Sequence, residues 1–157
     1  MGIFSFSNAK KVEETVEIRS LRLLIRYLEE TIKIIDVLIY EIANLPDNEK
    51  IIDFKKKVAG TIVEINFNLL KIKNTKSIIM NFRSGSTKTK REVNESFEGF
   101  QFIVHPVESK KVLLNLLNNQ DEKLDYVLER LKVSLQRVLN EESDSNLNSN
   151  SNSKKAA

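Results

Sequence analysis

The chain has 157 residues, of which 41% are hydrophobic and 30% charged, with a formal net charge of +3, values typical of one soluble folded domain. The absence of cysteine excludes disulfides, a thiolate nucleophile and iron–sulfur ligation, and the single histidine leaves no partner for a histidine metal site or triad. Four glycines and two prolines are too few for a turn-rich sandwich. We expect a mainly α protein without a cofactor, a small-molecule substrate or an enzymatic activity.

Residues 1–8 form a short apolar segment ahead of the first predicted helix. Its large apolar side chains precede the basic pair Lys10-Lys11, as in an interfacial membrane anchor, and are Ile3, Phe4 and Phe6. The alternative is a hydrophobic staple that folds back onto the helix. No signal peptide and no membrane-spanning stretch is recognisable. We expect a cytoplasmic protein, peripheral to the membrane if this segment inserts.

The first long helix is predicted from about Ala9 to Asn44, at the start of a helical domain over residues 9–140. Apolar residues recur there at steps of three and four and form two adjacent stripes, which are wider than a dimeric coiled-coil seam needs. With few other long segments to cover both stripes, we expect a homo-oligomer. The residues predicted to mediate self-association are Leu21, Leu24, Ile25, Leu28, Ile32, Ile35, Ile39 and Ile42.

A short break around Pro46 predicts a hairpin into a second helix, which begins near Ile51 and continues toward Phe82. Apolar residues at heptad spacing favour this helix. However, residues 61–82 include a β-branched run and an alternating stretch, so a pair of strands is the alternative. The fold predicted is a helical bundle with a long N-terminal α-hairpin.

The positive charge is concentrated in the middle of the chain. Residues 50–91 carry eleven basic and two acidic side chains, whereas acidic side chains are in excess in residues 1–49 and 92–157. Such a block is typical of binding to a polyanion, either an anionic membrane or nucleic acid, although a solvated lysine face gives the same count. The candidate residues are Lys55, Lys56, Lys57, Lys71, Lys73, Lys76, Lys88, Lys90 and Arg91, and the last three belong to a predicted basic loop over 83–96.

The aromatic segment at 97–104 predicts either a short β segment or a plug against the bundle. A third helical region is expected from about Val107 to Asn140, with a break possible in its polar stretch at 118–121. From residue 141 serine and asparagine dominate, and a disordered tail is predicted for 141–157.

The layout of residues 1–82, with a phenylalanine-containing start, a long helix and a hairpin, resembles the ESCRT-III family, including its archaeal cell-division members. The resemblance implies polymerisation on an anionic membrane, with Ile3, Phe4 and Phe6 inserted and Lys55 to Lys57 near lipid. The first helix differs from that family in being acidic overall. The functional prediction is a non-enzymatic scaffold that self-associates, with nucleic-acid binding through residues 50–91 as the alternative.

Overall fold

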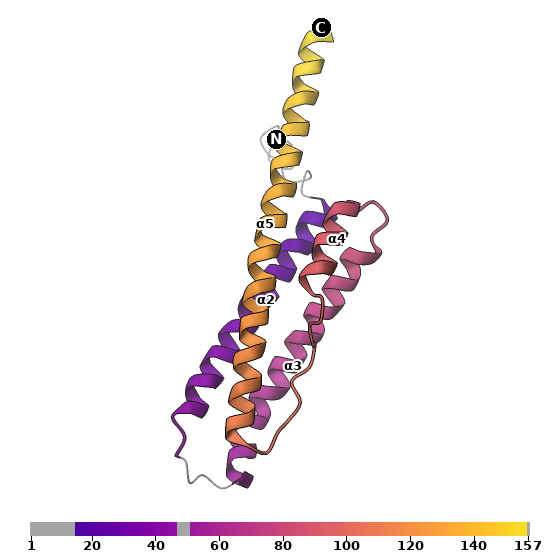
Figure 1. Ribbon diagram of the computed structural model, residues 1–157. Coiled ribbons are helices and arrows are strands. Elements are labelled where there is room, and N and C mark those ends of the chain that lie inside the picture. Colours follow the sequence, from indigo (N-terminus) through magenta and orange to yellow (C-terminus); the bar gives the residue numbers. More distant parts are fainter. Residues whose placement is uncertain (1–14, 47–50, 157) are drawn as a thin grey trace, which may run out of the picture.

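The computed structural model describes residues 15–46 and 51–156, including the side chains of 15–46, 53–56 and 58–144. These residues form four helices and no β-strand. Figure 1 labels the helices α2 (Val16–Ala43), α3 (Ile51–Asn81), α4 (Thr87–Ser96) and α5 (Lys110–Ala156). The prediction of a mainly α fold is confirmed.

The helix α2 is central to the bundle, because it packs against both α3 and α5. It begins at Val16, later than the predicted start near residue 9, since the Thr15 side chain caps it by accepting a hydrogen bond from the backbone N–H of Ile18 at 3.2 Å. It runs antiparallel to both α3 and α5 (Figure 1). The predicted hairpin of two long helices is therefore present.

The core is formed by apolar stripes on α2, α3 and α5. Residues 61–81 continue α3 as a helix, so the alternative of a strand pair is wrong. Heptad-spaced burial on one side of α3 explains why the helix prevails over β-branching, since packing outweighs local propensity. Core side chains that are fully buried include Leu21, Leu24, Leu28, Ile35, Ile42, Ile65, Leu69, Ile72, Leu113, Leu117, Leu124 and Leu131.

The predicted basic loop over 83–96 is mostly helical, because α4 occupies residues 87–96. The Ser86 side chain caps α4 by accepting a hydrogen bond from the N–H of Thr89 at 3.4 Å. The buried face of α4 consists of Thr89, Val93 and Ser96. Since only one of these is a large apolar residue, the segment lacks the apolar periodicity by which a helix is recognised in a sequence.

Residues 97–109 form an irregular strap that leads from the end of α4 to the start of α5 (Figure 1). The rings of Phe97, Phe100 and Phe102 pack together with centroids 4.9 to 5.6 Å apart. The Asn66 side chain accepts a hydrogen bond from the Val104 N–H at 2.7 Å and donates one to the Val104 carbonyl at 3.0 Å. The Asn66 side chain thus makes the hydrogen bonds that a neighbouring strand would otherwise supply to the backbone of Val104. The prediction of a short β segment is therefore wrong, whereas an aromatic segment packed against the bundle agrees with the structure.

Replacing Asn66 with alanine is expected to lower the free energy of unfolding by about 1 to 3 kcal/mol, because both polar backbone groups of Val104 lose their partner. Urea denaturation measures this loss. The matched control is Asn74→Ala on the exposed side of the same helix, which is expected to change stability little. An equal effect of the two substitutions would contradict the role of Asn66.

The helix α5 is continuous through the polar stretch at 118–121, so the possible break there is absent. Gln120 is buried there and donates a hydrogen bond to the carbonyl of Gln101 in the strap at 2.9 Å. The helix continues to Ala156 and extends beyond the other helices in Figure 1, which differs from the disordered tail predicted for 141–157. A helix that is already nucleated gains one backbone hydrogen bond per added residue, so its backbone can propagate into a polar segment.

Candidate functional site

The stripe predicted to mediate self-association is covered by the protein's own α3 and α5. Six of its residues are buried in the single chain, namely Leu21, Leu24, Ile25, Leu28, Ile35 and Ile42, while Ile32 and Ile39 are partly buried against the same core. Two long helices packed on α2 suffice to cover both stripes. These residues therefore pack in the core of the single chain.

The predicted polyanion-binding residues do not form one stripe. Lys55 pairs with Glu108 in the strap at 2.8 Å, and this pairing lowers the pKa of that carboxyl. The Lys76 ammonium lies 5.7 Å from the ring centroid of Phe97, on the strap side of α3. Lys71 is roughly 160° of helical rotation from Lys55.

The remaining predicted residues are also dispersed. Lys56 and Lys73 are exposed on α3, Lys88 and Arg91 are exposed on α4, and Lys90 is half-buried there. The side chain of Lys57 and the predicted membrane-contact residues Ile3, Phe4 and Phe6 lie outside the described part of the chain.

A row of exposed apolar side chains on α3 was missed by the sequence prediction. Val63, Phe67, Leu70 and Ile78, hereafter the α3 outer face, are each between 49% and 68% exposed. Their spacing of three, four and eight residues places them on the side of α3 opposite its buried stripe. The sequence signal is that α3 is apolar on both sides, and around Phe67 this gives the same apolar–polar alternation as a strand.

The α3 outer face also carries a cation–aromatic contact. The Lys71 ammonium lies 4.7 Å from the centroid of the Phe67 ring and 5.5 Å from that of Tyr27 on α2. The Arg26 guanidinium lies 5.7 Å from the same Tyr27 ring. These contacts hold the Phe67 ring beside positive charge at the surface.

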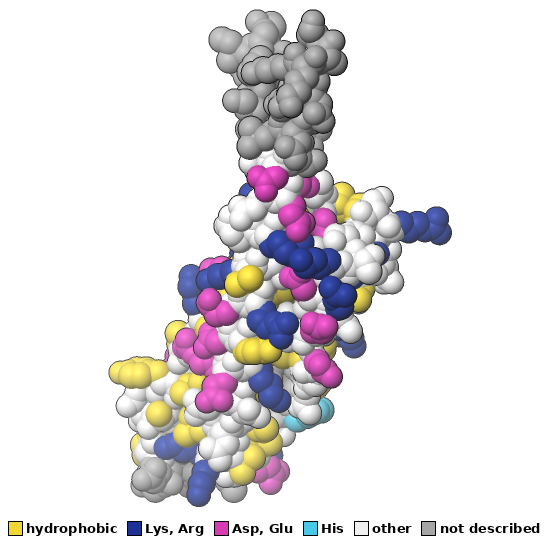
Figure 2. All heavy atoms as spheres, turned by 45° about the horizontal axis from the view of Figure 1, so that its top comes forward, with side chains coloured by type: hydrophobic (Ala, Val, Ile, Leu, Met, Phe, Trp, Pro, Cys, Tyr) yellow, Lys and Arg dark blue, Asp and Glu magenta, His cyan; other side chains and the backbone are white. Residues whose placement is uncertain are grey.

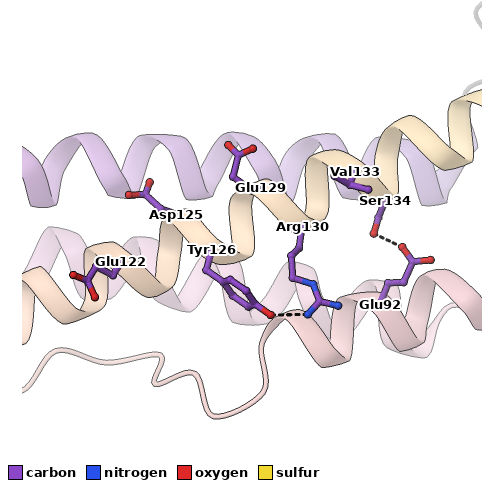
Figure 3. Close-up of a pocket in the computed structure, with 8 residues that line it drawn as sticks. All are labelled: Glu92, Glu122, Asp125, Tyr126, Glu129, Arg130, Val133 and Ser134. Atoms are coloured by element: carbon purple, nitrogen blue, oxygen red, sulfur yellow. Dashed lines mark hydrogen bonds between the residues drawn. The ribbon is translucent and has the colours of Figure 1, made fainter.

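An open hollow of about 750 Å³ lies along the outer side of α5. Its residues, hereafter the α5 hollow, are Glu122, Asp125, Tyr126, Glu129, Arg130, Val133 and Ser134 of α5 and Glu92 of α4. In Figure 3, Tyr126 and Arg130 point to one side of the helix, whereas Asp125 and Glu129 point to the other. Figure 2 shows the α5 side of the molecule, where acidic and basic side chains surround isolated apolar ones.

Two of these side chains give the hollow an apolar floor that is accessible from outside. Val133 is 70% exposed and Tyr126 is 56% exposed, and they are seven residues apart on α5. The Arg130 guanidinium donates a hydrogen bond of 2.6 Å to the Tyr126 hydroxyl and lies 3.7 Å from a carboxylate oxygen of Glu95. Arg130 thereby holds the Tyr126 ring in place, and more than half of this side chain stays exposed to solvent.

Acidic side chains crowd the side of α5 that faces α2. Partial burial, followed by a hydrogen bond and the charge of Asp36 on α2, raises the pKa of Asp121 to about 7. Burial and the charges of Asp36 and Glu129 also raise the pKa of Asp125. A positive group brought close to this cluster would relieve the repulsion.

An ion pair beside the C-terminal end of the α5 hollow attaches α4 to α5. The Arg137 guanidinium lies 2.9 Å from Glu92 and donates a hydrogen bond of 3.0 Å to the Thr89 hydroxyl. The Ser134 hydroxyl donates to the other carboxylate oxygen of Glu92 (Figure 3). Side-chain exposure is only 19% for Arg137 and 22% for Glu92, so this pair is better shielded than a surface salt bridge.

Comparison with known proteins gives no relative: no protein family, curated protein or solved structure matches this chain. Within the described residues, no acidic or histidine side chains group as a metal site would require. None of the described helices has the length and apolar character needed to cross a membrane. The ESCRT-III resemblance therefore stays a prediction. The candidate site consists of the α3 outer face and the α5 hollow.

Proposed function

We propose that this protein is a non-enzymatic helical interaction protein that self-associates, and that the α3 outer face mediates the contact. The observation that carries the proposal is the row of four exposed apolar side chains on one side of α3. Single exposed apolar residues are common on proteins, whereas a row at helical spacing is typical of a surface that binds a partner.

The driving force for this contact is the apolar area that these side chains leave in water. Fully burying one side chain of this size contributes about 1.5 to 3 kcal/mol, so covering Val63, Phe67 and Leu70 together supplies a substantial part of a binding free energy. Two of the three are branched aliphatic residues and Phe67 is held by Lys71, so little rotamer freedom is lost on binding. The α2 stripe supplies no such energy, because it is already buried.

The test is the mass of the full chain at increasing concentration, measured by size-exclusion chromatography with light scattering. We expect the wild-type mass to rise with concentration and the Val63→Glu variant to remain monomeric, because a carboxylate at this position would be desolvated in the contact. Val37→Glu is the matched control, since Val37 is 57% exposed on α2. A wild-type mass that stays that of a monomer at every concentration would refute self-association.

An anionic membrane is the second candidate partner, since the exposed Lys56 lies seven residues before Val63 on the same side of α3. Co-sedimentation with vesicles that contain anionic lipid tests it. If lipid covers the α3 outer face, Val63→Glu lowers the bound fraction whereas Val37→Glu does not.

A further inference from the structure

We infer that the α3 outer face of one copy binds the α5 hollow of a second copy, in a head-to-tail contact that repeats from chain to chain. The inference rests on the proposed self-association and adds which two surfaces meet. The two surfaces lie on different helices, so each copy presents one of each.

The charges of the two helices favour this pairing over contact between two α3 helices. Residues 51–81 hold six lysines and two acidic residues, so two α3 helices would repel each other. The α5 hollow instead carries Glu122, Asp125 and Glu129 around its apolar floor. The exposed Lys73 beside the α3 outer face and this acidic group are therefore complementary.

The apolar side chains of the two faces have the same spacing. Val63 and Leu70 are one heptad apart on α3, and Tyr126 and Val133 are one heptad apart on α5. An antiparallel arrangement that sets Val63 opposite Val133 therefore sets Leu70 opposite Tyr126. Phe67 then lies between the two apolar pairs, at the centre of the contact.

The same antiparallel register also pairs opposite charges. It brings exposed Lys73 between Glu122 and Asp125 on one flank of the contact, and exposed Glu64 beside Arg130 on the other. A parallel arrangement of the same apolar residues would place Glu64 beside Asp125, so that like charges meet. The charges of Lys73 and Glu64 thus favour the antiparallel register.

A contact between two different surfaces leaves one unused surface at each end of the pair. Further copies can bind there, so the assembly grows into a filament or closes as a ring. A contact of α3 with α3 would stop at the dimer. The size of the assembly therefore reports which surfaces meet.

The first experiment exchanges charges across the contact in the full chain. Lys73→Glu and Asp125→Lys are each expected to weaken self-association about tenfold, because each places like charges together. Combining the two substitutions is expected to restore most of the wild-type association. No recovery in the double variant, with unchanged circular dichroism, would contradict the predicted register.

The second experiment mixes two variants that are each blocked on one face. Val63→Glu keeps its α5 hollow and Val133→Glu keeps its α3 outer face, so each alone is expected to be monomeric and the mixture to form a dimer that does not grow. If Val133→Glu alone assembles like the wild type while Val63→Glu does not, self-association through α3 stands and the α5 hollow is not its partner. If wild-type chains never associate, both the inference and the proposed self-association are overturned.

Discussion

Replacing Arg137 with methionine is expected to lower the free energy of unfolding by about 2 to 4 kcal/mol, as for other shielded ion pairs that lose one partner. Without Arg137, the Glu92 carboxylate stays largely buried with the Ser134 hydroxyl as its hydrogen-bond donor, and Thr89 loses a donor. Chemical denaturation followed by circular dichroism measures the loss.

The control is the double variant Arg137→Met with Glu92→Gln. A neutral amide can accept the hydrogen bond of Ser134 without a buried charge, so the double variant is expected to recover most of the lost stability. Equal losses in the single and double variants would show that the unpaired Glu92 charge is not the cause of the destabilisation.

The second large effect is a fall in stability with rising pH that depends on Asp121. The pKa of Asp121 is about 7 in the folded state, against a reference value of 3.8. Between these two pH values the carboxyl is protonated in the folded protein and ionised in the unfolded chain. Stability therefore declines as the pH rises from about 4 through 7. Because the side chain is partly exposed and solvent screens it, we expect a decline of about 1 to 2 kcal/mol.

Asp121→Asn mimics the protonated form and is expected to remove this decline, making the variant more stable than the wild type at pH 8. Urea denaturation at pH 5 and pH 8 measures the difference. The control is Asp144→Asn, an exposed acid about six turns further along α5. An unchanged pH dependence in Asp121→Asn would exclude this carboxyl as its source.

The sequence predicts α2 and α3 well because their core residues follow a local rule. Leu21, Leu24 and Leu28 recur at helical spacing, and this spacing alone defines a buried stripe. The hairpin follows from the proline between the helices. Each of these inferences depends on residues that are close together in the chain.

The strap and α4 could not be predicted in the same way, because their partners are distant in sequence. The backbone of Val104 is paired by Asn66, and the carbonyl of Gln101 by Gln120. The buried face of α4 uses Thr89 and Ser96, whose side chains carry no apolar signal. Only the folded bundle brings these groups together.

The α3 outer face could not be identified from the sequence, for a related reason. Periodicity shows that the α2 stripe must be covered, but it does not show whether the same chain or another one covers it. The α3 outer face was overlooked because Val63 and Phe67 alternate with core residues of the same helix. The exposure of each side chain in the folded protein is what distinguishes the α3 outer face from the buried stripe of the same helix.

The most direct test of head-to-tail assembly uses the absence of native cysteine. A Leu70→Cys variant and a Tyr126→Cys variant are mixed and treated with a short bifunctional maleimide, and the products are separated by mass. Since these positions face each other in the predicted register, we expect mixed dimers to exceed dimers of either variant alone. Cross-linking of Leu70→Cys chains mainly to one another, or no cross-linking in the mixture, would contradict head-to-tail assembly.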